Sequence, residues 1–268
     1  MLHHPVLGRI RFRMKAVFSR AEIIHHILAR SEAIVVLEAP AGMGKSVILR
    51  QIAQREKLMV HADPRPPKPR SGKLVLWDVP PHAVPGPVPE RFAAGDCRAI
   101  IAKRPETEIP GLPRALAYGA AHVLDPELLL ISTAEAERFF GAEQAEPILA
   151  ASGGWPLVAF RGSGSGDLSR FLRFELLPHL ADEELVDLKL LAGGVELSSR
   201  GSERLFPIVR VGGDRKLQLC ATGLSGPLSA AVEELMAERL RTPAGANAIA
   251  EAYAAHGRPV EAITTYQQ

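Results

Sequence analysis

A glycine-rich loop is the feature that most restricts the fold of this chain. Residues 33–38 form a short apolar run rich in β-branched side chains, the loop Ala39-Pro40-Ala41-Gly42-Met43-Gly44-Lys45-Ser46 follows, and residues 47–53 are amphipathic. This order is typical of a strand, a phosphate-binding loop and a helix. Ala39 occupies the first position of the pattern Gly-x-x-x-x-Gly-Lys-Ser/Thr, so only the Gly-Lys-Ser end is intact. The alternative is an ordinary strand-to-helix turn with a solvated lysine.

The residue types in this loop suit phosphate chemistry. Gly42 and Gly44 allow backbone N–H groups to converge on phosphate oxygens, and a helix that begins near Lys45 adds the positive end of its dipole. The ammonium of Lys45 bridges the outer phosphates, and the hydroxyl of Ser46 is a ligand for Mg²⁺. The predicted nucleotide-binding residues of the loop are Ala41, Gly42, Met43, Gly44, Lys45, Ser46 and Val47.

The composition is that of an ordinary globular protein. The chain has 268 residues, enough for about two domains. Its net charge of +2 is too small to indicate nucleic acid or an anionic membrane as a partner. Cys97 and Cys220 lack metal-ligand spacing and are interpreted as reduced thiols. Because no segment has the length of a membrane span or the pattern of a signal peptide, we expect a cytoplasmic protein.

Four more apolar runs follow the loop, at residues 58–62, 74–78, 99–102 and 121–124. None shows the alternation of a strand with one wet face, which favours central strands of a parallel sheet covered on both faces. We therefore predict an α/β fold with a nucleotide-binding domain of the P-loop NTPase type over residues 1–128.

Two charged residues lie at the expected carboxyl edge of this sheet. Asp78 ends the run 74–78, where Mg²⁺ beside bound phosphates would sit, and it is the candidate metal ligand and catalytic acid. Two consecutive acids are usual there, but Val79 follows, so nucleotide binding is favoured over fast hydrolysis. Arg104 follows the run 99–102 and is the candidate sensor of the terminal phosphate. The alternative for Asp78 is an acid that only ends a strand.

The second half of the chain is predicted to be mostly helical. Residues 129–164 form helices, the first with a capping box at Ser132 and Glu135, and a glycine-serine joint follows at residues 162–166. In residues 165–242 two helices precede a hairpin at 207–211 and 216–219, a pattern that favours a winged-helix-like domain. Residues 243–268 have the spacing of a tetratricopeptide-like (TPR) helical hairpin, which either packs on the preceding domain or continues in residues past Gln268.

The chain resembles the STAND-class signal-transducing ATPases, the large LuxR-type regulators typified by the maltose-regulon activator. The loop is similar to that family's Ser-Pro-Ala-Gly-Tyr-Gly-Lys-Thr, which also lacks the first glycine. Further carriers of the resemblance are residues 74–78, 100–105 and 112–124, Gly154-Trp155-Pro156, and residues 248–262 with Tyr253 and His256-Gly257. The resemblance covers nearly the whole chain. The family's Tyr-His-His segment, which links the winged helix to bound nucleotide, is replaced by Leu219-Cys220-Ala221-Thr222-Gly223-Leu224.

The resemblance implies an ATP/ADP-binding domain, a helical lid at residues 129–164, a winged helix and the start of a TPR array. It implies that Pro156 meets the adenine from the lid, with Arg20 and Phe18 near the nucleotide on the leader side. It also implies an inducer or regulatory protein as partner, self-association on activation, and DNA binding only through a domain outside this chain.

These features predict an adenine-nucleotide-binding regulatory switch with ATP/ADP and Mg²⁺ as cofactors, at most a slow ATPase. Two alternatives are open. One is a P-loop ATPase or small-molecule kinase, which needs a second substrate pocket and a base. The other is a degenerate scaffold that keeps the fold without useful nucleotide affinity.

Overall fold

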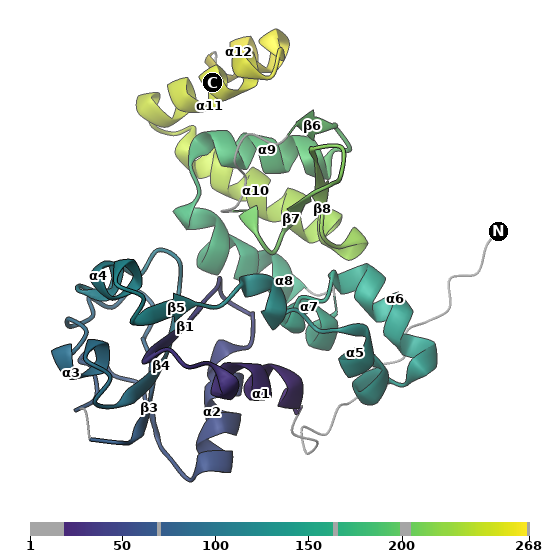
Figure 1. Cartoon of the computed structure of the whole chain (residues 1–268). Helices are drawn as coiled ribbons and strands as arrows, with labels where there is room; N and C mark the ends of the chain where they lie inside the picture. The colour runs from purple at the N-terminus through teal and green to yellow at the C-terminus, as the bar shows by residue number, and fades with distance from the viewer. Residues whose placement is uncertain (1–18, 69–70, 163–165, 199–204, 267–268) are drawn as a thin grey trace.

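The computed structural model describes residues 19–68, 71–162, 166–198 and 205–266. The predicted basic leader, Phe18 and most of the glycine-serine joint lie outside these residues. The described part is an α/β structure with a five-stranded, all-parallel sheet and many helices, as the sequence predicts (Figure 1). Within that part, no helix combines the length and the apolar character that a membrane span requires.

The parallel sheet has the strand order β2-β3-β4-β1-β5. Its strands are β1 (Ile34–Glu38), β2 (Val60–His61), β3 (Leu74–Asp78), β4 (Arg98–Lys103) and β5 (Ala121–Val123). The register aligns Glu38 with Lys103 and Asp78 with Ala102, so the carboxyl ends of the three neighbouring strands β3, β4 and β1 finish at one level. The phosphate loop leaves β1 at this edge, which is where open α/β sheets bind ligands.

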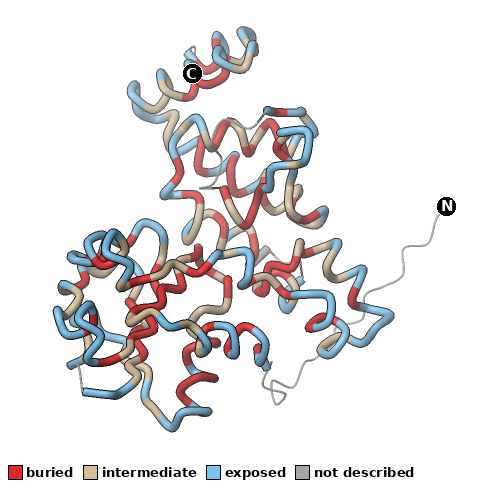
Figure 2. Tube along the Cα trace, viewed as in Figure 1, coloured by how far each residue is buried: buried red, intermediate tan, exposed pale blue. Residues whose placement is uncertain are grey.

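Helices and loops cover both faces of the sheet (Figures 1 and 2). The helices of this part are α1 (Ala21–Ala29), α2 (Lys45–Glu56), α3 (Glu90–Ala93) and α4 (Leu112–Ala117). Val35 and Leu37 share one buried cluster with α1 and α2, whereas Ile34 and Val36 share another with Phe92 of α3 and the residues of α4. Burial on both faces explains why the strand sequences show no polar alternation.

Short helices follow the sheet: η1 (Pro126–Leu129), α5 (Thr133–Phe140), α6 (Ala142–Ser152) and α7 (Pro156–Arg161). The predicted capping box is present at the start of α5, where the Ser132 hydroxyl accepts from the Glu135 N–H at 3.2 Å and the Glu135 carboxylate accepts from the Ser132 N–H at 3.1 Å. Trp155 is the N-cap of α7, and Pro156 takes the first helical position, where no intrahelical N–H is needed.

The C-terminal part contains a second, antiparallel sheet. Its elements are α8 (Gly166–Phe171), η2 (Leu172–Leu176), η3 (Leu177–His179), α9 (Asp182–Ala192), β6 (Leu197–Ser198), β7 (Val209–Val211), β8 (Lys216–Leu219), η5 (Thr222–Leu224) and α10 (Ser225–Arg239). The predicted hairpin is confirmed as β7 and β8, with Val209 opposite Leu219. The first of the two helices that the sequence predicts before this hairpin is a succession of α, π and 3₁₀ turns that ends at His179. Pro178, which has no N–H to donate, lies in its last turn.

A pair of helices ends the described chain. These are α11 (Pro243–Ala255) and α12 (Pro259–Tyr266), which contact each other, and α11 also contacts α9. His256 at the end of α11 lies with its Nε2 atom 2.6 Å from the carboxylate of Asp187 in α9. The pair therefore packs on the preceding helices, which is one of the two arrangements that the sequence leaves open.

Candidate functional site

The glycine-rich loop folds as a tight turn from β1 into α2. Gly42 and Gly44 have φ angles of +78° and +81°, a backbone region that side chains with a Cβ rarely adopt. Gly44 is the N-cap of α2, and its carbonyl accepts from the N–H groups of Val47 and Ile48 at 3.0 Å each. The first turn of a helix leaves N–H groups without intrahelical partners at the positive end of the dipole. The loop therefore has the backbone geometry of an anion-binding site.

Lys45 lies at the centre of this loop. Its Nζ atom donates to the carbonyl oxygen of Ala39 at 2.6 Å and to that of Pro40 at 2.8 Å. An ammonium has three donors, so one remains for a phosphate oxygen. The pKa of Lys45 is lowered to about 8, mainly by burial and also by the charge of Arg104, while the charge of Asp78 opposes the shift. The loop thus holds a partly buried cation that an anionic ligand would stabilise.

Ser46 and Asp78 are the residues that the sequence predicts as ligands of a magnesium ion. Ser46 is in the first turn of α2, and Asp78 ends β3, two strands away from β1 in the sheet. Asp78 is close enough to Lys45 for its charge to raise the pKa of that lysine. Over the described ranges, no group of three or more histidines, cysteines, aspartates or glutamates gathers as a metal site. One hydroxyl and one carboxylate suit Mg²⁺, which takes most of its remaining ligands from water and phosphate.

Arg104 connects the sheet to the C-terminal part. Its Nη2 atom lies 2.5 Å from the carboxylate of Glu175 in η2, and its Nη1 atom lies 3.8 Å from that of Glu106. The Arg104 side chain is 13% exposed and that of Glu175 is 38% exposed, so the contact is shielded from water on the arginine side only. Its charge also lowers the pKa of Lys45, which places the guanidinium near the phosphate loop. Arg104 is thus near the loop while it pairs with a carboxylate of another part of the chain.

The start of α7 packs directly on the phosphate loop. The N–H of Leu157 donates to the carbonyl of Gly42 at 3.2 Å. A Cβ atom at Gly42 would lie 3.0 Å from the Cβ of Leu157 and 3.0 Å from the Nε1 atom of Trp155. Pro156, between these two residues, is buried beside the loop. The structure therefore brings Pro156 to the predicted site, and it adds Trp155 and Leu157, which the sequence analysis did not select.

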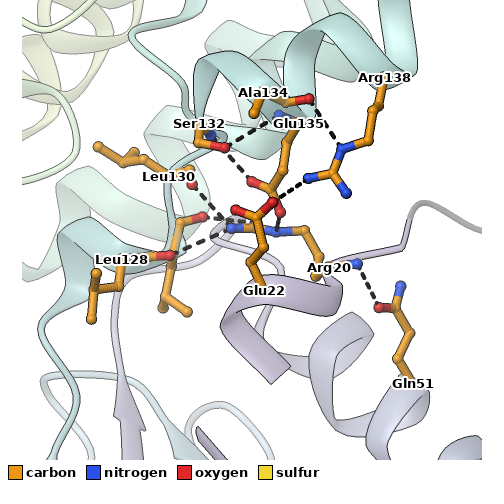
Figure 3. A network of polar contacts seen from close by, with 10 residues as sticks. Arg20, Glu22, Gln51, Leu128, Leu130, Ser132, Ala134, Glu135 and Arg138 are labelled. Carbon is orange, nitrogen blue, oxygen red and sulfur yellow. Dashed lines mark hydrogen bonds and ion pairs between the residues drawn. The ribbon is translucent and has the colours of Figure 1, made fainter. Parts of the chain in front are cut away.

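Arg20 lies in a different environment (Figure 3). Its guanidinium donates to the carboxylate of Glu135 at 2.8 Å and to the carbonyls of Leu129 and Leu130 at 3.0 Å each. Arg20 is 2% exposed, and its backbone N–H donates to Gln51 of α2 at 2.9 Å. Burial lowers the pKa of Arg20, while the Glu135 carboxylate opposes that shift. These contacts join the start of α1 to η1 and α5, and the predicted role of Arg20 in nucleotide binding stays a prediction.

Two carboxylates near the loop were not selected from the sequence. Glu106 comes two residues after Arg104, so its position beyond β4 is a local signal that could have been used. Glu175 is 71 residues from its partner Arg104, and nothing in its neighbourhood in the sequence indicates this contact.

No protein-family model and no curated protein matches the chain.

Proposed function

We propose that this chain is an adenine-nucleotide-binding regulatory switch with slow or no ATP hydrolysis, and that it acts as part of a LuxR-type transcriptional regulator. The contact of Lys45 with the carbonyls of Ala39 and Pro40 carries the proposal. These hydrogen bonds hold a partly buried ammonium beside the N-terminus of α2, and phosphate is a natural ligand of that arrangement. Adenine as the base, and the regulatory context, come from the resemblance to the STAND class.

In this proposal the loop N–H groups and Lys45 bind the phosphates of ATP or ADP. Ser46 and Asp78 hold Mg²⁺, which supplies charge neutralisation to the phosphates when it is bound. Pro156, Trp155 and Leu157 close over the loop at Gly42. Asp78 at the end of β3 is followed by Val79, so this position has one acid instead of two consecutive acids. A second acid that would polarise the attacking water is missing at that position, so bound ATP is hydrolysed slowly or not at all.

The switch in this proposal operates through Arg104. With ADP or no nucleotide, Arg104 pairs with Glu175 of η2 at 2.5 Å, which holds the C-terminal part on the sheet. ATP brings a terminal phosphate that competes with Glu175 for the same guanidinium, since arginine pairs with both groups in the same geometry. ATP would therefore weaken this contact and favour a more open arrangement.

Calorimetry with ADP and with ATP in the presence of Mg²⁺ tests nucleotide binding. The variant Lys45→Ala removes the central cation, whereas Lys57→Ala removes an exposed lysine at the other end of α2 and is the matched control. We expect the wild type and Lys57→Ala to bind alike and Lys45→Ala to bind at least tenfold more weakly. Equal heats for the wild type and Lys45→Ala would contradict the proposal.

A degenerate scaffold is the second candidate. The packing of Trp155 and Leu157 against Gly42 favours it, because these side chains lie close to the loop that must receive phosphates. Thermal unfolding with saturating ATP or ADP separates the two candidates, since a ligand that prefers the folded state raises its stability. No rise in melting temperature would support the scaffold. A steady-state phosphate release of about 1 per second or faster would instead indicate an ATPase or kinase.

A further inference from the structure

The two tryptophans of this chain differ in what their indole N–H groups meet. Trp77 and Trp155 are both fully buried. The Nε1 atom of Trp77 donates to the carbonyl oxygen of Asp63 at 2.8 Å. The Nε1 atom of Trp155 is also shielded from solvent, but no described residue accepts its hydrogen. Because nearly all buried donors in proteins have a partner, the unpaired N–H of Trp155 calls for an explanation.

The N–H edge of the Trp155 ring faces the phosphate loop. A Cβ atom at Gly42 would lie 3.0 Å from Nε1, which is among the atoms nearest to that position. Trp155 also belongs to the main hydrophobic cluster, and the ring of Phe171 lies 6.2 Å from its ring between centroids. Among these neighbours, only the loop can present a polar atom to the indole N–H.

The loop itself is rich in donors. The N–H groups of the first turn of α2 and the ammonium of Lys45 all donate hydrogen bonds. Two carbonyls at the start of the loop accept from Lys45, and the carbonyl of Gly42 accepts from the N–H of Leu157. A group that satisfies the indole together with these donors has several acceptor oxygens and a negative charge. Phosphate is such a group.

We propose that the indole N–H of Trp155 donates to a phosphate oxygen of the bound nucleotide. The inference rests on the proposed nucleotide binding and adds a side-chain donor to the loop N–H groups and Lys45. It is separate from the expectation for Pro156, which concerns the adenine base. Trp155 is thereby a phosphate-binding residue supplied by the N-cap of α7, from outside the glycine-rich loop.

Phosphate binding at Trp155 changes the contact between α7 and the loop. Because Nε1 is enclosed, a phosphate oxygen reaches it only if the start of α7 shifts relative to Gly42. The backbone hydrogen bond from Leu157 to Gly42 joins the two, and its length of 3.2 Å is at the upper end of the usual range. The shift gives the unpaired N–H a charged acceptor, so nucleotide favours the shifted arrangement. Trp155 thus couples occupation of the loop to the position of α7.

NMR of the full chain with ¹⁵N-labelled tryptophan tests the inference directly. The spectrum contains two indole N–H signals, which Trp77→Phe assigns. We titrate with ADP, inorganic pyrophosphate and adenosine, each in the presence of Mg²⁺. The proton signal of Trp155 should move downfield with ADP and with pyrophosphate, whereas adenosine, which has no phosphate, should leave it in place. The signal of Trp77 should not respond to any of the three, because its N–H is already paired with Asp63.

Calorimetry with ADP gives the second measurement. Trp155→Phe keeps an aromatic ring and removes the N–H, so it should lower the affinity for ADP about tenfold. Trp77→Phe is the matched control and should bind ADP like the wild type. Three results would overturn the role of Trp155 while nucleotide binding stands: ADP binding without a downfield shift of the Trp155 signal, a shift with adenosine alone, or equal ADP affinity in the wild type and folded Trp155→Phe. No binding of ADP, ATP or pyrophosphate to the wild type would overturn both proposals.

Discussion

The buried ion pair of Arg20 and Glu135 gives the sharpest prediction about stability. The two side chains are 2% and 4% exposed, and the Arg20 guanidinium also donates to carbonyls of η1 and the residue after it. Arg20→Met leaves the Glu135 carboxylate buried without its cation. Removing one partner of a buried pair costs about 3–5 kcal/mol, because an uncompensated charge stays in the interior. We expect a loss of that size in the free energy of unfolding.

The double variant Arg20→Met/Glu135→Leu should be less destabilised than Arg20→Met. It leaves no buried charge. Its remaining cost is the unsatisfied carbonyls, about 1–3 kcal/mol in all, together with the hydrogen bond that the Ser132 N–H loses when Glu135 is replaced. The exposed pair of Arg55 and Glu56 is the control, with side chains 56% and 39% exposed. Arg55→Met should change the free energy of unfolding by less than about 1 kcal/mol.

Urea unfolding followed by tryptophan fluorescence measures these differences, since Trp77 and Trp155 are both fully buried in the native protein. Equal losses in Arg20→Met and Arg55→Met would refute the reasoning. ATP binding by the folded double variant tests the role that the resemblance implies for Arg20. An unchanged affinity means that the arginine is structural, and a tenfold loss means that it also serves the nucleotide.

Four further predictions concern the phosphate loop and the neighbouring Arg104. The pKa of Lys45 is lowered from 10.5 to about 8, mainly by burial, so the nucleotide-free lysine loses its proton above that pH. ATP affinity should therefore fall above pH 8 by up to about tenfold per pH unit. Calorimetry in buffers of different ionisation enthalpy detects the proton taken up on binding. In the nucleotide-free protein the unfolded chain binds more protons between about pH 8 and 10.5, so the contribution of Lys45 to the free energy of unfolding rises with pH across that window. Gly42→Ala should lower the melting temperature more than Gly44→Ala. Both glycines have a positive φ, but only at Gly42 would the added Cβ lie 3.0 Å from other side chains. Equal shifts in melting temperature would contradict the contact of the loop with α7. Glu175→Gln should raise ATP affinity about threefold or more and leave ADP affinity unchanged, because the carboxylate that competes with the terminal phosphate for Arg104 is removed. Calorimetry measures both affinities. Equal changes for the two nucleotides would count against Arg104 as the sensor.

Local sequence was sufficient for the elements at the phosphate loop. Three segments are contiguous in the sequence: the apolar run before the loop, the glycines of the loop and the amphipathic segment after it. The conformational preference of each residue therefore agrees with that of its neighbours. The same holds for the capping box at Ser132 and Glu135, whose two hydrogen bonds span three residues. The unbroken apolar runs indicated strands buried on both faces, and the structure confirms a parallel sheet.

Tertiary structure alone decided which charges meet. Arg20 and Glu135 are 115 residues apart, and Arg104 and Glu175 are 71 residues apart. A charged side chain at the end of a strand or helix has the same local pattern whether it faces water, a phosphate or a distant carboxylate. Its partner depends on how the helices after the sheet pack back onto it, and that packing is set by apolar contacts spread over the whole chain. The sequence thus determines the loop and the sheet, whereas the pairing of Arg104 with Glu175 exists only once the C-terminal part lies against the sheet.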